Sequence, residues 1–172
     1  LFSTFQTPVP PIEPYPVMQP QGVDPPEHKK FRSLLAPLFT PAAVAKMHAE
    51  LRRRTTVLLD AFADGGSCEF GRDFASVLPT GMFLYLMGMP EDRLPEFVTL
   101  SEVFMRSNDE AERAQNIQQI YAVIGEYLDW RATRPGDDLG SVLVQARDEN
   151  GQPLDRQDVL NCGFLLFVAG LD

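Results

Sequence analysis

The distribution of proline restricts the fold of this chain more than any other sequence feature. Ten of the 15 prolines lie in the first 41 residues, at positions 8, 10, 11, 14, 16, 20, 25, 26, 37 and 41. Proline lacks a backbone N–H and restricts the residue before it, so dense prolines disfavour regular structure. We therefore expect residues 1–23 to form an extended, irregular segment.

Helical signals follow almost without interruption. Apolar periodicity, capping residues and breakers predict helices at about 24–36, 41–64, 72–87, 91–105, 111–134 and 138–147, and from residue 155 onward. Asp24 is predicted to cap the first helix, and Pro79 is a candidate kink in the third. Residues 67–71 are the one candidate for a short strand. The expected class is mainly α, a multi-helix fold with an irregular Pro-rich N-terminal segment.

Composition excludes several classes of function. The chain has 172 residues, 44% of them apolar, which suits one domain or most of one. Its formal charge of -9 disfavours binding to nucleic acid, whose phosphates require a basic surface. The longest apolar run, residues 162–171, is too short to span a bilayer. The two cysteines, Cys68 and Cys162, form no disulfide framework or metal-type spacing, and a cytoplasmic protein is expected.

The last nine residues, Phe164–Asp172, are the most informative about function. They form an apolar run that ends on a glycine and then a carboxylate. Glycine costs about 1 kcal/mol relative to alanine inside a helix. A carboxylate after a buried run is costly without a specific use. The chain also stops here without a capping residue, as expected of an interrupted protein.

Two separate motifs resemble one family. Ala169-Gly170-Leu171-Asp172 resembles the Ala/Gly-Gly-x-Asp/Glu-Thr signature in the distal helix of cytochromes P450. Asp24-Pro25-Pro26-Glu27-His28, followed by Arg32, is similar to the Asp-Pro-Pro-Glu-His-x-x-x-Arg segment of soluble, camphor-hydroxylase-like bacterial members. The resemblance implies that residues 1–172 are part of a P450 domain. In it, residues 1–23 belong to the substrate-loop region and residues 24–172 run to the start of the distal heme helix.

The resemblance implies a heme-thiolate monooxygenase that holds heme b (iron protoporphyrin IX). Such an enzyme hydroxylates a small apolar organic substrate with O2 and electrons from a ferredoxin-type redox partner. The iron ligand of the family is a cysteine in a Phe-x-x-Gly-x-x-x-Cys-x-Gly loop, a context that neither Cys68 nor Cys162 has. The chain by itself therefore lacks the axial ligand and is expected to be inactive.

The family pattern also implies roles for single residues. His28 and Arg32 would bind the heme propionates, and Lys29, Lys30 and Arg32 would face the redox partner. The alternative for all four is an ordinary solvated helix face. Ala169 and Gly170 would leave room beside the iron for dioxygen and substrate, while Asp172, with Gly170, would serve proton delivery. A solvent-exposed carboxylate at a helix end is the alternative for Asp172. Substrate-pocket positions would be Leu165, Val168, Phe104, Met105 and Met18. Core packing is the alternative for Leu165 and Val168.

Two other functions remain open from sequence. One is a catalytically inactive relative that acts as a binding or regulatory module. The other is an unrelated helical scaffold whose matches are accidental.

Overall fold

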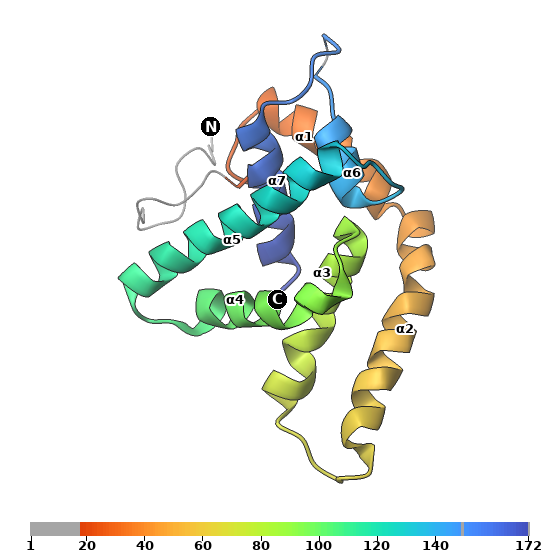
Figure 1. Cartoon of the computed structure of the whole chain (residues 1–172). Coiled ribbons are helices and arrows are strands. Elements are labelled where there is room, and N and C mark those ends of the chain that lie inside the picture. The colour runs from red at the N-terminus through yellow and green to blue at the C-terminus, as the bar shows by residue number, and fades with distance from the viewer. Residues whose placement is uncertain (1–17, 149, 172) are drawn as a thin grey trace.

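A computed structural model describes residues 18–148 and 150–171 (Figure 1). Within these ranges every element is helical, and the one extended feature is an isolated antiparallel bridge between Arg147 and Pro153. The mainly α prediction is confirmed. The elements are α1 (Glu27–Leu35), η1 (Ala36–Phe39), α2 (Pro41–Ala63), η2 (Gly71–Ala75), α3 (Val77–Met87), η3 (Glu91–Arg93), α4 (Leu94–Arg106), α5 (Glu110–Ala132), α6 (Leu139–Gln145) and α7 (Arg156–Ala169).

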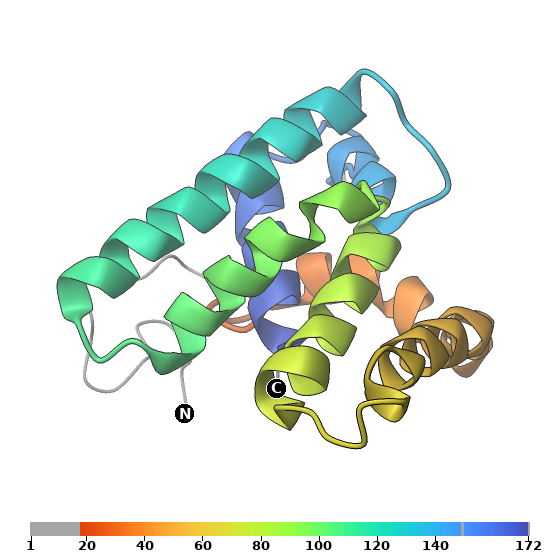
Figure 2. The same cartoon turned by 60° about the horizontal axis from the view of Figure 1, so that its bottom comes forward.

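Helix α7 lies in the middle of the bundle in both ribbon views (Figures 1 and 2). It packs against α3, α5 and α6, and α5 in turn packs against α4 and α6. Helix α2 lies at the periphery, where it packs against η1, η2 and α3. None of the helices in the described ranges is long and apolar enough to cross a membrane.

The core is centred on three phenylalanine rings from three different helices. Phe167 of α7 lies 5.1 Å from Phe83 of α3 and 5.5 Å from Phe97 of α4, measured between ring centroids. Each of the three side chains is almost completely buried. The contacts fix α7 against α3 and α4, and so position the last turn of α7.

Side-chain caps explain several of the helix starts. The Thr40 hydroxyl accepts a hydrogen bond from the backbone N–H of Ala43, and the Asp155 carboxylate accepts one from Gln157. Each cap satisfies a donor that has no partner within its helix. The predicted starts of α2 and α7 are therefore confirmed.

The start of α1 differs from the prediction. The helix begins at Glu27 and has Pro26 at its N-cap position, without a side-chain capping bond there. Asp24 thus lies two residues before the N-cap, and its main-chain carbonyl accepts a hydrogen bond from the backbone N–H of His28 at 3.1 Å. The predicted N-cap position of Asp24 is wrong.

The segment between α2 and α3 also corrects the sequence analysis. Residues 67–71 form no strand, and a π-helical turn covers Gly71–Ala75. The backbone N–H of Ser76 reaches back five residues to the carbonyl of Gly71. Pro79 lies in the first turn of α3, where a missing N–H is tolerated, rather than at an interior kink. The predicted single helix is therefore divided at Ser76.

Candidate functional site

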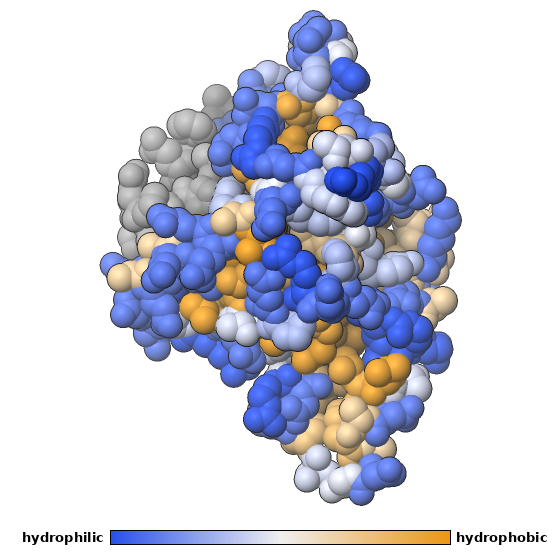
Figure 3. All heavy atoms as spheres, in the orientation of Figure 1, coloured by the Kyte–Doolittle hydropathy of each residue, from blue (hydrophilic) through white to orange (hydrophobic). Residues whose placement is uncertain are grey.

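An apolar groove of about 400 Å³ lies between α2, α3 and the last turn of α7. Apolar side chains reach the surface between α3 and the lower half of α2 (Figure 3). A groove of this size falls in the range of small-molecule sites. Its lining residues are Phe39, Leu51, Leu78, Pro79, Met82, Phe83, Leu86, Leu139, Leu166, Ala169 and Gly170.

Two small residues, Ala169 and Gly170, line the groove at the end of α7, beside Leu166. Ala169 and Gly170 are both exposed. Gly170 follows the last helical residue with φ of -85°, a conformation open to any residue. A Cβ atom at Gly170 would lie 3.2 Å from the Leu166 carbonyl oxygen. The backbone conformation does not require glycine here, but a Cβ atom would crowd the carbonyl oxygens of the last turn of α7 itself.

Two of the predicted pocket residues, Leu165 and Val168, are not in the lining of this groove, to which α7 contributes Leu166, Ala169 and Gly170. Leu165 lies four residues before Ala169 and is turned by about 40° from it, whereas Val168 is turned by about 160° from Leu166. Both Leu165 and Val168 are half-buried. Val168 packs against the core, whereas Leu165 is not among the side chains that do so. Helix α7 therefore presents one face to the groove and a second, partly open apolar face.

The remaining pocket candidates are divided between two surfaces. Half-buried Phe104 meets Phe164 of α7 edge-on, with ring centroids 5.9 Å apart. Met18 is half-buried against the core. Met105 is 53% exposed and lines a separate hollow together with Leu171. The structure brings Phe104 to α7 and leaves Met105 on a different surface.

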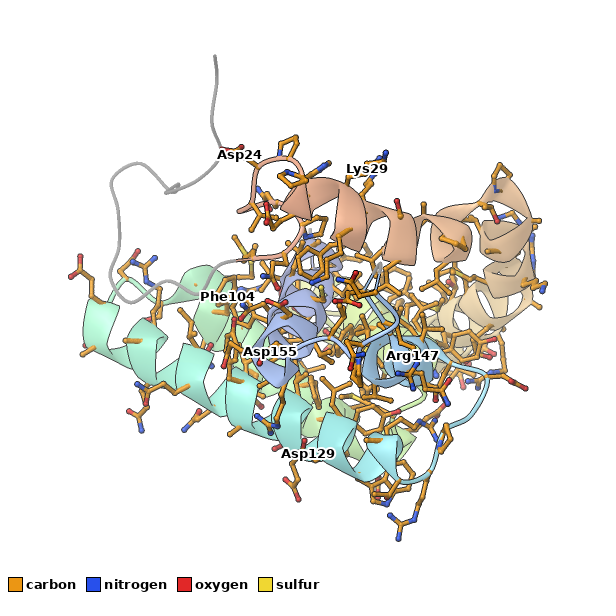
Figure 4. The ribbon with its side chains drawn as sticks, turned by 90° about the horizontal axis from the view of Figure 1, so that it is seen from above. Asp24, Lys29, Phe104, Asp129, Arg147 and Asp155 are labelled. Carbon is orange, nitrogen blue, oxygen red and sulfur yellow. The ribbon has the colours of Figure 1, made fainter. Side chains whose placement is uncertain are left out.

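The basic residues of α1 have distinct environments. His28 is half-buried and Arg32 exposed, one turn apart on the helix. No acidic side chain in the described ranges pairs with either of them. Lys29 points outward (Figure 4), whereas Lys30 lies 3.7 Å from the Asp158 carboxylate. Of the residues predicted for the propionates and for the redox-partner surface, only Lys30 pairs with an acidic side chain in the described part of the chain.

The two cysteines lie in different environments, and Cys162 is not suited to ligate iron. Cys68 is exposed in the connection before η2, whereas Cys162 is fully buried within α7. Burial, and secondarily the Asp158 charge, raises the pKa of the Cys162 thiol to about 12. Because a metal-ligating cysteine must be a thiolate, Cys162 is a core residue. The described residues also contain no group of three or more His, Cys, Asp or Glu side chains that could hold a metal ion.

The described residues suit one face of a heme, but they do not supply its axial ligand. The exposed Ala169 and Gly170 lie beside the apolar groove, and an apolar lining of this kind suits a flat apolar ring. His28 and Arg32 supply donors of the kind that bind carboxylates, and within residues 18–148 and 150–171 no acidic side chain pairs with them. The thiolate ligand must come from elsewhere. Asp172, the predicted proton-delivery residue, lies outside the described residues.

A polar cluster on α7 was not found by sequence reasoning. The Tyr121 hydroxyl and the Gln157 amide both donate to Asn161 Oδ1, at 2.9 and 3.0 Å. One turn earlier on α7, Asp158 Oδ1 accepts a hydrogen bond of 2.8 Å from Gln19 Nε2. The one available signal was a buried asparagine four residues before Leu165, in an otherwise apolar run.

Comparisons with known proteins agree with the resemblance. No family model matches the chain. The chain is 34% identical over 161 residues to a probable cytochrome P450 127A1 of Sinorhizobium fredii, covering 93% of this chain and 38% of that protein. It is 33% identical over 154 residues to the mycinamicin IV hydroxylase/epoxidase of Micromonospora griseorubida, covering 88% of this chain and 38% of that protein. The chain thus spans about 38% of the length of these relatives.

Solved structures give the same result for the fold. The cytochrome P450 PksS of Bacillus subtilis superposes with a TM-score of 0.79 at 28% identity, covering 88% of this chain and 39% of that chain. A mutant of P450 EryK in complex with erythromycin B superposes with a TM-score of 0.80 at 28% identity, covering 96% of this chain and 44% of that chain. Similarity in both sequence and fold is incompatible with an accidental match by an unrelated scaffold.

Proposed function

The chain belongs to the cytochrome P450 family, and we propose that it supplies the distal wall of a heme-thiolate monooxygenase that hydroxylates a small apolar organic substrate. The observation that carries this proposal is the exposed Ala169–Gly170 end of α7 beside an apolar groove. A cytoplasmic location, O2 as co-substrate and a ferredoxin-type electron donor belong to the same proposal.

The bound heme would supply oxygen activation, and this chain would position the reactants around it. Ala169 and Gly170 leave space at the end of α7, where larger side chains would fill the approach. The apolar lining excludes water, which strengthens electrostatic interactions within the site. The second face of α7, with Leu165 and Val168, would contact the apolar body of the substrate.

His28 and Arg32 would anchor the heme propionates. They lie four residues apart on α1 and have no acidic partner in the described ranges, so both can donate to carboxylates. Arg32 can do so with two parallel N–H bonds. Asp172 would hold a proton close to the reacting oxygen, and Gly170 would give that proton an unobstructed route.

Lys29 and Arg32 are the stronger candidates for the redox-partner surface. Both are exposed, and basic side chains accelerate encounter with an acidic protein in a salt-dependent way. Lys30 would contribute less, because its ammonium group lies 3.7 Å from the Asp158 carboxylate.

The test is the carbon monoxide difference spectrum of the reduced full-length polypeptide. A red-shifted band typical of thiolate-ligated heme supports the enzyme, and the absence of any heme signal contradicts it. We predict that His28→Ala with Arg32→Ala accelerates heme loss after dilution. The matched control is His48→Ala with Arg52→Ala, an equally spaced exposed pair on α2. Equal heme retention in the two double variants would contradict the propionate assignment.

Asp172→Asn provides a separate test of proton delivery. We expect the variant to lose turnover much more than substrate affinity, because the amide cannot exchange a proton. The measurement is product formation at saturating substrate beside a spectral binding titration. Unchanged turnover would remove Asp172 from the proton path, and a heme-binding protein without any turnover would indicate an inactive relative.

A further inference from the structure

A small hollow of about 140 Å³ lies between α5, α6 and the start of α7. The three helices pack against one another around it. Within the described ranges no residue lines both this hollow and the groove at the end of α7. It has no role in the function proposed above. Its lining residues are Leu128, Asp129, Ala132, Val144, Leu154, Arg156, Val159 and Leu160.

The floor and walls of the hollow are apolar. The side chains of Leu128, Val159 and Leu160 are almost fully buried. Those of Val144 and Leu154 are half-buried and pack against the core. Such a lining offers a ligand dispersion contacts and the burial of apolar surface, but no hydrogen bond. The hollow therefore selects for an apolar molecule.

A bidentate ion pair forms the rim of the hollow. Arg156 Nε donates to Asp129 Oδ1 at 2.9 Å, and Arg156 Nη2 donates to Asp129 Oδ2 at 2.6 Å. Both side chains are more than half exposed. Because each charged group already bonds the other at two positions, the rim offers few partners to a water molecule inside the hollow, and an ordered water needs two to four of them.

Gly125 allows the rim to lie where it does. This glycine is buried in the middle of α5, where glycine is unfavourable relative to alanine. A Cβ atom at this position would lie 3.2 Å from Arg156 Nη2 and 3.2 Å from Leu160 Cδ2. A side chain there would push against both the rim and the floor. The missing side chain thus lets the Arg156 guanidinium lie across α5 and reach Asp129, one turn further along that helix.

The volume of the hollow limits the size of its ligand. A dry apolar cavity of about 150 Å³ in another protein binds benzene or xenon, and this hollow is of similar volume. An exposed ion pair contributes little to stability, so the rim can open at little cost when a ligand enters.

We propose that this hollow is a binding site for a compact apolar molecule of the size of benzene, which packs on Leu128, Val159 and Leu160 beside the Arg156–Asp129 pair. The inference does not depend on the proposed function, because none of the lining residues is assigned to the heme, the substrate or the redox partner.

The first test is anomalous diffraction from crystals of the full-length polypeptide under xenon pressure. Xenon is an apolar probe, and its position is found without any measurement of activity. We expect a xenon peak in contact with Val159 and Leu160. Xenon found only elsewhere in the protein would overturn the proposal.

The second test is a benzene titration in solution, followed by the NMR shifts of leucine and valine methyl groups. We expect the methyl groups of Val159 and Leu160 to shift together, with a dissociation constant on the order of 1 mM, because a ligand of few atoms gains limited affinity. Shifts confined to methyl groups outside the lining would contradict the site.

One pair of variants on α5 separates the hollow from the rest of the helix. Ala132→Leu places an isobutyl group at an exposed position of the lining and should weaken benzene binding about tenfold. Ala122→Leu, also exposed on α5 but outside the lining, is the matched control and should leave the affinity unchanged. Equal benzene affinity in the two variants would overturn the assignment.

The outcomes also separate this inference from the proposed function. Xenon in the hollow of a polypeptide that gives no heme signal would support the site and contradict the enzyme. A thiolate-ligated heme in a protein whose hollow takes up neither xenon nor benzene would support the enzyme and overturn the site.

Discussion

Phe167 is the residue whose removal should loosen the site most. Its ring is fully buried and joins Phe83 at 5.1 Å and Phe97 at 5.5 Å. Phe167→Ala removes the contact that fixes α7 against α3 and α4, three residues before Gly170. Because the three rings come from different helices, the cavity cannot close by a local shift.

The expected cost is large. A buried Phe→Ala change costs about 3–5 kcal/mol, and the loss of two aromatic pairs favours the upper end of that range. For a chain of this size, about 4–5 kcal/mol lowers the melting temperature by roughly 8–20 °C. Urea unfolding followed by circular dichroism measures the change in the free energy of unfolding. The slope of this free energy against urea concentration should be the same for the variant and the wild type.

Phe70→Ala is the matched control. It deletes the same atoms from a side chain that is 60% exposed and stacks on Phe74 at 5.1 Å. We expect it to cost less than about 1 kcal/mol. Equal destabilisation by the two substitutions would refute the assignment of the three-ring cluster as the support of α7.

Two further predictions concern buried polar groups. The Tyr127 hydroxyl donates to the Met87 carbonyl oxygen at 2.6 Å. Tyr127→Phe should therefore lower the free energy of unfolding in urea by about 1–3 kcal/mol. The control, Tyr85→Phe at an exposed site, should lower it by about 0.5 kcal/mol or less. Burial raises the pKa of the Cys162 thiol from 9.0 to about 12, so only the unfolded chain loses this proton between these values. Stability should be full below pH 9 and fall by up to about 1.4 kcal/mol per pH unit above it. Cys162→Ala should flatten that decline in unfolding titrations at increasing pH, and an unchanged slope would contradict a buried, protonated thiol.

The helix boundaries were predictable where local chemistry sets them. Thr40 and Asp155 cap their helices, and the Asn150–Gly151 turn places Gly151 at φ +77°. Each depends on a few adjacent residues, so the sequence was sufficient. The π-helical turn at Gly71–Ala75 was not predictable, because the backbone bond from Ser76 to Gly71 has no distinct residue pattern.

The site was predictable only as far as its motifs extend. Ala169 and Gly170 are adjacent in the chain, and His28 and Arg32 are four residues apart on one predicted helix. The members of each pair are therefore close together whatever the tertiary fold. The separation of Leu165 from the groove was missed, because both faces of α7 are apolar and periodicity cannot tell which neighbour covers which face.

The sequence by itself determined the helical class, most helix limits and the family resemblance, because these depend on residues close together in the chain. Tertiary structure decided which face of α7 borders the groove and which meets Phe104. It also decided that Gln19 meets Asp158 across 139 positions of sequence. Such contacts depend on how whole helices pack.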